Sequence, residues 1–396
     1  FHVLATAPTI PHPASMPGSV FCARNSFTQR LMALSALHPG VVRVYSEILN
    51  QAKGGCELYL SSVEKFPWLK GLNVWEAGQY FANAVLMGWI ENSSKKPTVL
   101  IRPETHQMIP DKAELILLSS NANIVCRKFR IQGLEKPEAL KIVRINSHEQ
   151  LFETPSSTLT WSTKPQAIIL NFKDQRNLLR RLDALAAKNT KILVHTEYPD
   201  VSLPRLTRTK VEVRSGPLLD ERALEALPIQ HCKCVVVPDS CEKNRDSDSR
   251  VIAAINMVLQ ARKKTPQTER LHVVASLQDP ANVDVLTNAL AGEHITLDTV
   301  LHDDLEMGAI VQMLSSPNLQ AVYNDILDSS ESEIRLVDAM EFVSPGQELS
   351  FGDLTARVRK AHAILLGTMK ASKKLHLAPH RAKKLKLESG DFLVVI

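Results

Sequence analysis

Three acidic residues at the ends of predicted strands could take part in ion chemistry. Glu197 lies near the end of a predicted strand at 190–199, and Asp239 and Glu242 follow the apolar part of another at 232–240. Ligands of open α/β sheets bind at the carboxyl ends of parallel strands. Calcium prefers clustered carboxylate and carbonyl oxygens. The three acids are therefore candidate calcium ligands, although acids in such places also cap helices or face solvent.

Other groups that bind metals are sparse. Cys232 and Cys234 form a C-x-C pair in a predicted strand, so both side chains point to one face. A metal pair is conceivable there, but free cysteines are commonly buried as small apolar side chains. We interpret His294 and His302 as surface or hydrogen-bonded histidines, and the acidic run at 328–333 as a solvated turn.

The turn after the first predicted strand lacks the glycines of a dinucleotide site. Those glycines let the backbone approach a pyrophosphate at a helix N-terminus. Here "NFKDQRNLL" (171–179) contains no glycine, and Lys173, Asp174, Gln175 and Arg176 occupy the place. Glu197 could bind a ribose, but one acidic residue without the glycines is not sufficient for a dinucleotide site. Motifs of serine hydrolases, zinc peptidases and Walker ATPases are also missing, so we expect no NAD or ATP and no catalysis.

The element order in the second half of the chain indicates an α/β lobe. Predicted strands lie at 164–172, 190–199, 210–217, 232–240, 269–280 and 294–300, with amphipathic helices after most of them. Continuous Val/Ile/Leu strands that alternate with helices are typical of a parallel sheet covered on both faces. We expect a Rossmann-like lobe with a doubly wound sheet.

A hexapeptide occurs twice. "VYSEIL" (44–49) and "VYNDIL" (322–327) share four residues, and Pro39 and Pro317 lie five positions before them. Predicted strands follow both copies at nearly equal spacing. A repeat of this kind indicates a duplicated module, in which a crossover helix leads into a small α+β lobe.

This repeat divides the chain into five predicted segments. They are an irregular N-terminal segment at 1–25, a crossover helix and small lobe at 26–120, a linker at 121–163, the Rossmann-like lobe at 164–302, and a second crossover helix and small lobe at 303–396. The first Rossmann-like lobe would lie before Phe1, so we expect a fragment of a larger protein.

Composition argues against several classes of protein. The net charge of +5, from 47 basic and 42 acidic residues, is too balanced to indicate a nucleic-acid-binding protein. No apolar run approaches the roughly 18 residues that a membrane-spanning helix needs. Six cysteines without metal-like spacing suggest a reducing compartment.

Several stretches resemble the CASTOR/POLLUX family of ion channels. They are "RLMALSALHPGVVRVYSEIL" (30–49), "LPIQHCKCVVVPDSCEKNRDSDSR" (227–250), "GQELSFGDLTARVRKAHAILLGTM" (346–369) and "SGDFLVVI" (389–396). The tandem order of lobes also resembles the RCK domains that regulate tetrameric cation channels. The resemblance covers residues 22–120 and 164–396.

The resemblance implies a regulatory gating ring, without catalysis. Rings of this family are tetramers that respond to calcium and pull on the pore helices of the full-length protein, in nuclear or plastid envelopes. Ion binding between lobes would change their angle, which requires different affinities for two ring states. Two alternatives stay open: a nucleotide-dependent enzyme on the Rossmann-like lobe, and an RCK-shaped scaffold without ligand binding.

The second crossover helix, at 303–316, carries a wide apolar arc. Its members are Leu305, Ala309, Ile310, Met313 and Leu314. The arc could bind another copy of the chain or be buried within the chain. If the apolar arc mediates assembly, Met313→Asp should weaken the association of oligomers more than it destabilises the folded monomer.

Overall fold

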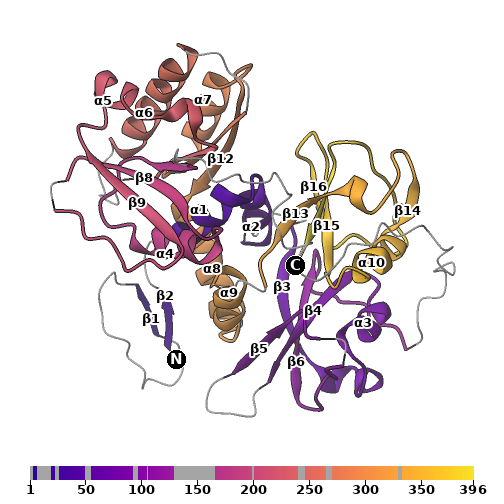
Figure 1. Ribbon diagram of the computed structural model, residues 1–396. Coiled ribbons are helices and arrows are strands. Elements are labelled where there is room, and N and C mark those ends of the chain that lie inside the picture. Colours follow the sequence, from indigo (N-terminus) through magenta and orange to yellow (C-terminus); the bar gives the residue numbers. More distant parts are fainter. Residues whose placement is uncertain are drawn as a thin grey trace. The chain divides into compact units, whose positions relative to one another are not determined.

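The computed structural model describes residues 3–6, 19–22, 26–49, 55–91, 97–104, 106–128, 166–198, 200–239, 246–264, 270–328 and 332–396 (Figure 1). Most of the predicted N-terminal segment and linker lie outside these residues, as does Glu242. Within the N-terminal segment, β1 (Val3–Thr6) pairs in parallel with β2 (Ser19–Cys22).

The chain forms two compact units. The first combines 1–42 with 159–311, and the second combines 43–158 with 312–396. The domain limits predicted above follow the repeat along the sequence and remain a prediction. The compact units instead take segments from both repeats.

A six-stranded parallel sheet forms the centre of the first unit. Its strands are β7 (Ala167–Ile169), β8 (Thr190–Thr196), β9 (Thr209–Ser215), β10 (Cys234–Val237), β11 (Leu271–Leu277) and β12 (Ile295–Leu301). Their order is β9-β8-β7-β10-β11-β12, and every neighbouring pair is parallel. This confirms the prediction of a doubly wound Rossmann-like sheet.

Helices cover both faces of this sheet. They are α4 (Arg176–Leu185), α5 (Glu221–Glu225), α6 (Ser247–Lys263) and α7 (Ala281–Ala289). Every residue of β10 and β11 is buried, because both strands lie inside the sheet. Alternate side chains of a strand face opposite sides: Val273 packs in the core with Val251 of α6, whereas the ring of His272 lies beside α1 (Ser26–Leu37).

The helix α1 belongs to the first repeat, yet it packs against β10, β11 and β12 of the second. Buried Asp298 on β12 accepts hydrogen bonds from Ser35 Oγ at 2.7 Å and from the backbone N of Gly40 at 2.6 Å. At the other end of α1, Thr28 Oγ1 lies 2.8 Å from His302 Nδ1. Polar contacts therefore fix one end of α1 to β12 and the other end to the residue that follows β12.

Asp183 of α4 holds the segment that leads into β9. Its carboxylate accepts from the backbone N of Thr207, Arg208 and Thr209 at 2.9, 2.8 and 2.7 Å. Burial alone would raise the pKa of Asp183, but these hydrogen bonds lower it to about 2. The carboxylate is therefore more stable in the folded chain than in the unfolded chain.

This shift predicts an acid-dependent contribution to stability. Because the folded pKa lies below its ordinary value, the contribution is fully present above about pH 4 and is lost as the pH falls toward 2. We expect Asp183→Asn to lower the free energy of unfolding by about 2 kcal/mol at neutral pH, and by less at pH 3. Denaturant titrations across this range measure the difference. Exposed Asp174→Asn serves as the control, and equal effects of both variants would contradict the assignment.

Two four-stranded antiparallel sheets with the same topology lie in the described part of the second unit. One has the order β3-β6-β4-β5, and the other β13-β18-β15-β16. The first comprises β3 (Glu57–Ser62), β4 (Ala84–Glu91), β5 (Thr98–Ile101) and β6 (Ala113–Ser119). The second comprises β13 (Arg335–Asp338), β15 (Leu365–Met369), β16 (Leu375–Leu377) and β18 (Phe392–Val395). Each copy of the repeat thus builds one four-stranded sheet.

The two sheets share an irregularity at one position. The pairing of β4 with β6 shifts between Leu86 and Gly88, and that of β15 with β18 shifts between Leu365 and Gly367. A Cβ on Gly88 would lie 1.9 Å from the carbonyl oxygen of Leu100, and one on Gly367 would lie 2.3 Å from that of His376. Only glycine fits where the neighbouring strand approaches so closely.

The short helices of the two copies begin in the same way. The helix α3 (Val74–Ala77) starts with a capping box between Asn73 and Glu76, and α10 (Phe351–Arg359) starts with one between Ser350 and Asp353. In both boxes, side-chain oxygens accept hydrogen bonds from backbone N–H groups that have no partner inside the helix. A two-stranded sheet, β14 (Glu348–Ser350) with β17 (Lys384–Lys386), accompanies α10.

The repeated hexapeptides lie in the helices α2 (Val41–Leu49) and α9 (Leu319–Asp328). The C-terminal end of each helix accepts a hydrogen bond from a side chain outside that helix. Tyr45 Oη donates to the carbonyl oxygen of Ile326 at 2.8 Å. In the opposite direction, Gln312 Nε2 donates to the carbonyl oxygen of Ile48 at 2.7 Å, and Gln312 Oε1 accepts from Tyr323 Oη. Both acceptors belong to the last four carbonyls of their helices, which have no partner within the helix.

Gln312→Ala should therefore destabilise the second unit. It removes two buried hydrogen bonds and leaves the Ile48 carbonyl and the Tyr323 hydroxyl without this partner. We expect a loss of about 1–3 kcal/mol in the free energy of unfolding, measured by denaturant titration. Gln260→Ala, at an exposed site on α6, is the control. A loss no larger than that of the control would contradict the role of Gln312.

Candidate functional site

The carboxyl edge of the parallel sheet is the candidate site, and buried side chains fill its centre. Between β7 and β10 the strand order reverses, which is where open α/β sheets bind ligands. Gln175, 1% exposed, accepts from the Lys173 N at 2.7 Å and donates from Nε2 to the carbonyl oxygen of Asp239 at 3.4 Å. Asn171 Nδ2 donates to the carbonyl oxygen of Pro238 at 3.2 Å. These side chains occupy the turn where a dinucleotide site needs glycine.

Glu197 already has two partners. Its Oε1 accepts from the backbone N of Leu218 at 2.6 Å, and its Oε2 forms an ion pair with Arg250 Nη2. Arg250 belongs to the "DSR" stretch at the start of α6. A calcium ion at Glu197 would therefore have to displace the guanidinium or share the carboxylate with it.

Asp239 is buried just after the end of β10, and its Oδ2 accepts from Gln278 Nε2 at 3.3 Å. Glu242 lies outside the described residues. In the described part of the chain, no group of three or more His, Cys, Asp or Glu side chains could hold a metal ion. The calcium ligands thus remain a prediction.

Asp248 has a role that its position in the sequence did not reveal. Its carboxylate accepts from the backbone N of Gln278 at 2.8 Å, the backbone N of Asp279 at 2.9 Å and Asn282 Nδ2 at 2.7 Å. Asp248 therefore fixes the loop after β11, while Arg250, two residues on, binds Glu197. The "DSR" motif was visible in the sequence, but its partners lie some thirty or more residues away.

His195 is a second residue that sequence reasoning missed. The ring is 2% exposed, and neither of its nitrogens has a hydrogen-bond partner among the described residues. Burial lowers the pKa of His195, and Glu197 opposes the effect. A Cβ on Gly216 would lie only 3.3 Å from His195 Nε2, so glycine leaves room for the ring.

The cysteines and histidines named from the sequence do not form a metal site among the described residues. Cys232 and Cys234 are both buried, and burial raises the pKa of the Cys232 thiol to about 12. Such thiols stay protonated at neutral pH and are poor metal ligands. His302 contacts Thr28, and His294 is exposed.

Burial corrects one surface prediction and decides between the two alternatives left open for the apolar arc at 303–316. Glu333, in the run expected to be a solvated turn, is 2% exposed and lies 3.4 Å from Arg335 Nη2. In α8 (His302–Ser315), four residues of the predicted assembly arc are buried within the chain: Leu305, Ala309, Ile310 and Met313. Met313→Asp would therefore unfold the chain first, because it buries a charge. Leu314 is exposed.

None of the helices in the described residues is both long and apolar enough to cross a membrane. No family model matches the sequence. Two curated ion channels do: the chain is 20% identical to the ion channel CASTOR of Lotus japonicus over 410 aligned positions, and 20% identical to the probable ion channel POLLUX of Oryza sativa subsp. japonica over 374. These alignments cover 93% and 85% of the chain.

The chain is homologous to these ion channels. It spans 45% of the length of CASTOR and 36% of the length of POLLUX, so it corresponds to less than half of each relative. Among solved structures, the human SLO3 gating ring matches with a TM-score of 0.62 and 12% identity, over 95% of this chain and 75% of that one. This likeness concerns the fold, which is Rossmann-like and of the RCK type.

Proposed function

We propose that the chain is the regulatory gating-ring region of a cation channel and is not an enzyme. The observation that supports this most directly is homology to CASTOR and POLLUX over most of the chain, together with a fold like that of a gating ring. The duplicated small lobes agree with a tandem RCK arrangement. In this proposal, ion binding changes the populations of two ring states and so the force on the pore.

The proposal includes partners and a place in the cell. The ring is a homotetramer attached to the pore helices of the full-length protein, and the envelope of the nucleus or of a plastid is the expected membrane. Calcium is the proposed ligand, with Glu197, Asp239 and Glu242 as its candidate carboxylates.

Of the two alternatives, a nucleotide-dependent enzyme is less well supported. Gln175 and Asn171 fill the turn where a pyrophosphate would approach the backbone, and the amide of Lys173 is already bonded. We therefore propose neither NAD nor ATP as a cofactor. A scaffold that keeps the fold without binding a ligand is the remaining alternative, and it predicts no response to calcium.

Calcium titration of the purified chain separates these functions. Calorimetry measures binding, and light scattering measures oligomer size. Arg250 is the cation that competes for Glu197, so Arg250→Gln should increase calcium affinity severalfold, whereas Glu197→Gln should weaken it about tenfold or more. Arg214→Gln, which removes the exposed partner of Glu212, should change nothing.

Different results test the calcium-responsive ring, the site at Glu197 and the scaffold alternative. Saturable binding with a change in oligomer size supports a calcium-responsive ring. Binding that is insensitive to both Glu197 and Arg250 contradicts the proposed site alone. A chain that stays monomeric and binds no calcium favours the scaffold.

A further inference from the structure

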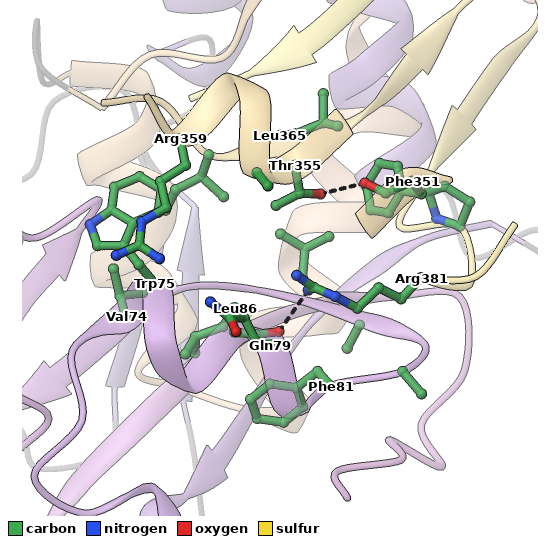
Figure 2. Close-up of a pocket in the computed structure, with 17 residues that line it drawn as sticks. Val74, Trp75, Gln79, Phe81, Leu86, Phe351, Thr355, Arg359, Leu365 and Arg381 are labelled. Atoms are coloured by element: carbon green, nitrogen blue, oxygen red, sulfur yellow. Dashed lines mark hydrogen bonds between the residues drawn. The ribbon is translucent and has the colours of Figure 1, made fainter. Parts of the chain in front are cut away.

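A cavity of about 60 Å³ lies in the second unit, where the two small lobes meet. Equivalent residues of the repeats line it: Val74 and Leu86 from the first lobe, and Phe351 and Leu365 from the second. Its walls are mainly apolar, and Figure 2 shows Trp75 and Phe81 on the side of the first lobe. The volume has room for roughly four to six water molecules, or for a small organic molecule.

The charged groups of this cavity are two arginines of the second lobe. Figure 2 shows the guanidinium of Arg381 in the middle of the cavity and that of Arg359 beside Trp75. The Arg359 guanidinium carbon lies 5.5 Å from the Trp75 ring centroid. Among the described residues, those that the first lobe contributes to the lining are all uncharged, so this pair of charges belongs to one copy only.

Arg381 is a largely buried cation without a salt bridge in the described part of the chain. Its Nη1 donates to the carbonyl oxygen of Gly78 at 3.0 Å. The nearest acid that affects it, Asp353, is engaged in the capping box with Ser350. Burial lowers the pKa of Arg381 to about 10, which Asp353 opposes, so the group is charged at neutral pH. A guanidinium has five donors, and one carbonyl leaves most of them available to a ligand.

We propose that this cavity binds a small organic monocarboxylate, whose carboxylate lies on Arg381 and whose apolar part contacts Leu86 and Leu365. Carboxylate and guanidinium are matched in shape and charge. The apolar walls favour a ligand with a hydrocarbon part over inorganic phosphate, which would lose hydration without compensation. This ligand would contact both lobes and stabilise their association. The inference does not depend on the proposed channel function.

Butyrate is the probe, and the emission of Trp75 is the readout. The full 396-residue chain is titrated with sodium butyrate, sodium phosphate and neutral butyramide. We expect a saturable change with butyrate and much weaker changes with the other two. Trp75→Phe should remove the optical signal, which assigns it to the cavity rather than to the other tryptophans.

Substitutions locate the binding. Arg381→Gln should weaken butyrate binding about tenfold or more, whereas Lys384→Gln, an exposed cation three residues away, should leave it unchanged. Ala356→Leu keeps both arginines and fills the cavity from an exposed position of α10, so it should also prevent binding even if the Arg381 variant does not fold. Failure of butyrate to saturate, equal binding of phosphate, or a loss with Lys384→Gln as large as that with Arg381→Gln would each overturn the proposal.

Discussion

The buried carboxylate of Asp298 is the contact on which the connection between the two repeats depends. It is 4% exposed, and a charge at such a place is stable only with partners. Ser35 and Gly40 supply hydrogen bonds from the first repeat, and His272 Nε2 lies 3.7 Å away within the second. The crossover helix α1 thus becomes part of the Rossmann-like unit of the other repeat. The leading helix of the first repeat therefore packs against strands of the second.

Duplication explains much of the second unit. Both copies have the same strand order, a bulge at Gly88 or Gly367, and a capping box at the start of α3 or the equivalent α10. The same local structures therefore form in both copies of the repeat. The copies differ at their contact. The hydroxyl of Tyr45 donates directly to a carbonyl at the end of α9. The hydroxyl of Tyr323 instead donates to Gln312, which in turn donates to a carbonyl at the end of α2. The arginines of the cavity likewise occur in the second copy only. These differences are where a duplicated fold can acquire a function that its symmetric ancestor lacked.

Local patterns in the sequence predicted the regular parts of this fold. Runs such as Cys234–Val237 are continuous and apolar because central parallel strands are buried on both faces. The hexapeptide repeat predicted two equivalent helices. Each of these signals depends on residues that are close in sequence.

Contacts between distant residues were not predictable in this way. The helical spacing of Met313 could not reveal whether it faces a neighbour or its own chain, because periodicity defines a face and not what covers it. Glu197 was recognised as an acid at a strand end, but its partner Arg250 is 53 positions away. No sequence pattern indicated a role for Arg381, because its cavity forms only where two lobes that are separate in the sequence meet.

Hydrogen–deuterium exchange on Asp298→Asn tests the account most directly. If Asp298 fixes the first repeat to the second, amides of α1 and β12 should exchange faster in the variant, while those of β15 and α10 stay as protected as in the wild type. Unchanged protection of α1 would contradict the claim that this carboxylate joins the repeats. A uniform loss of protection over the whole chain would contradict it as well, because the effect would then be general destabilisation.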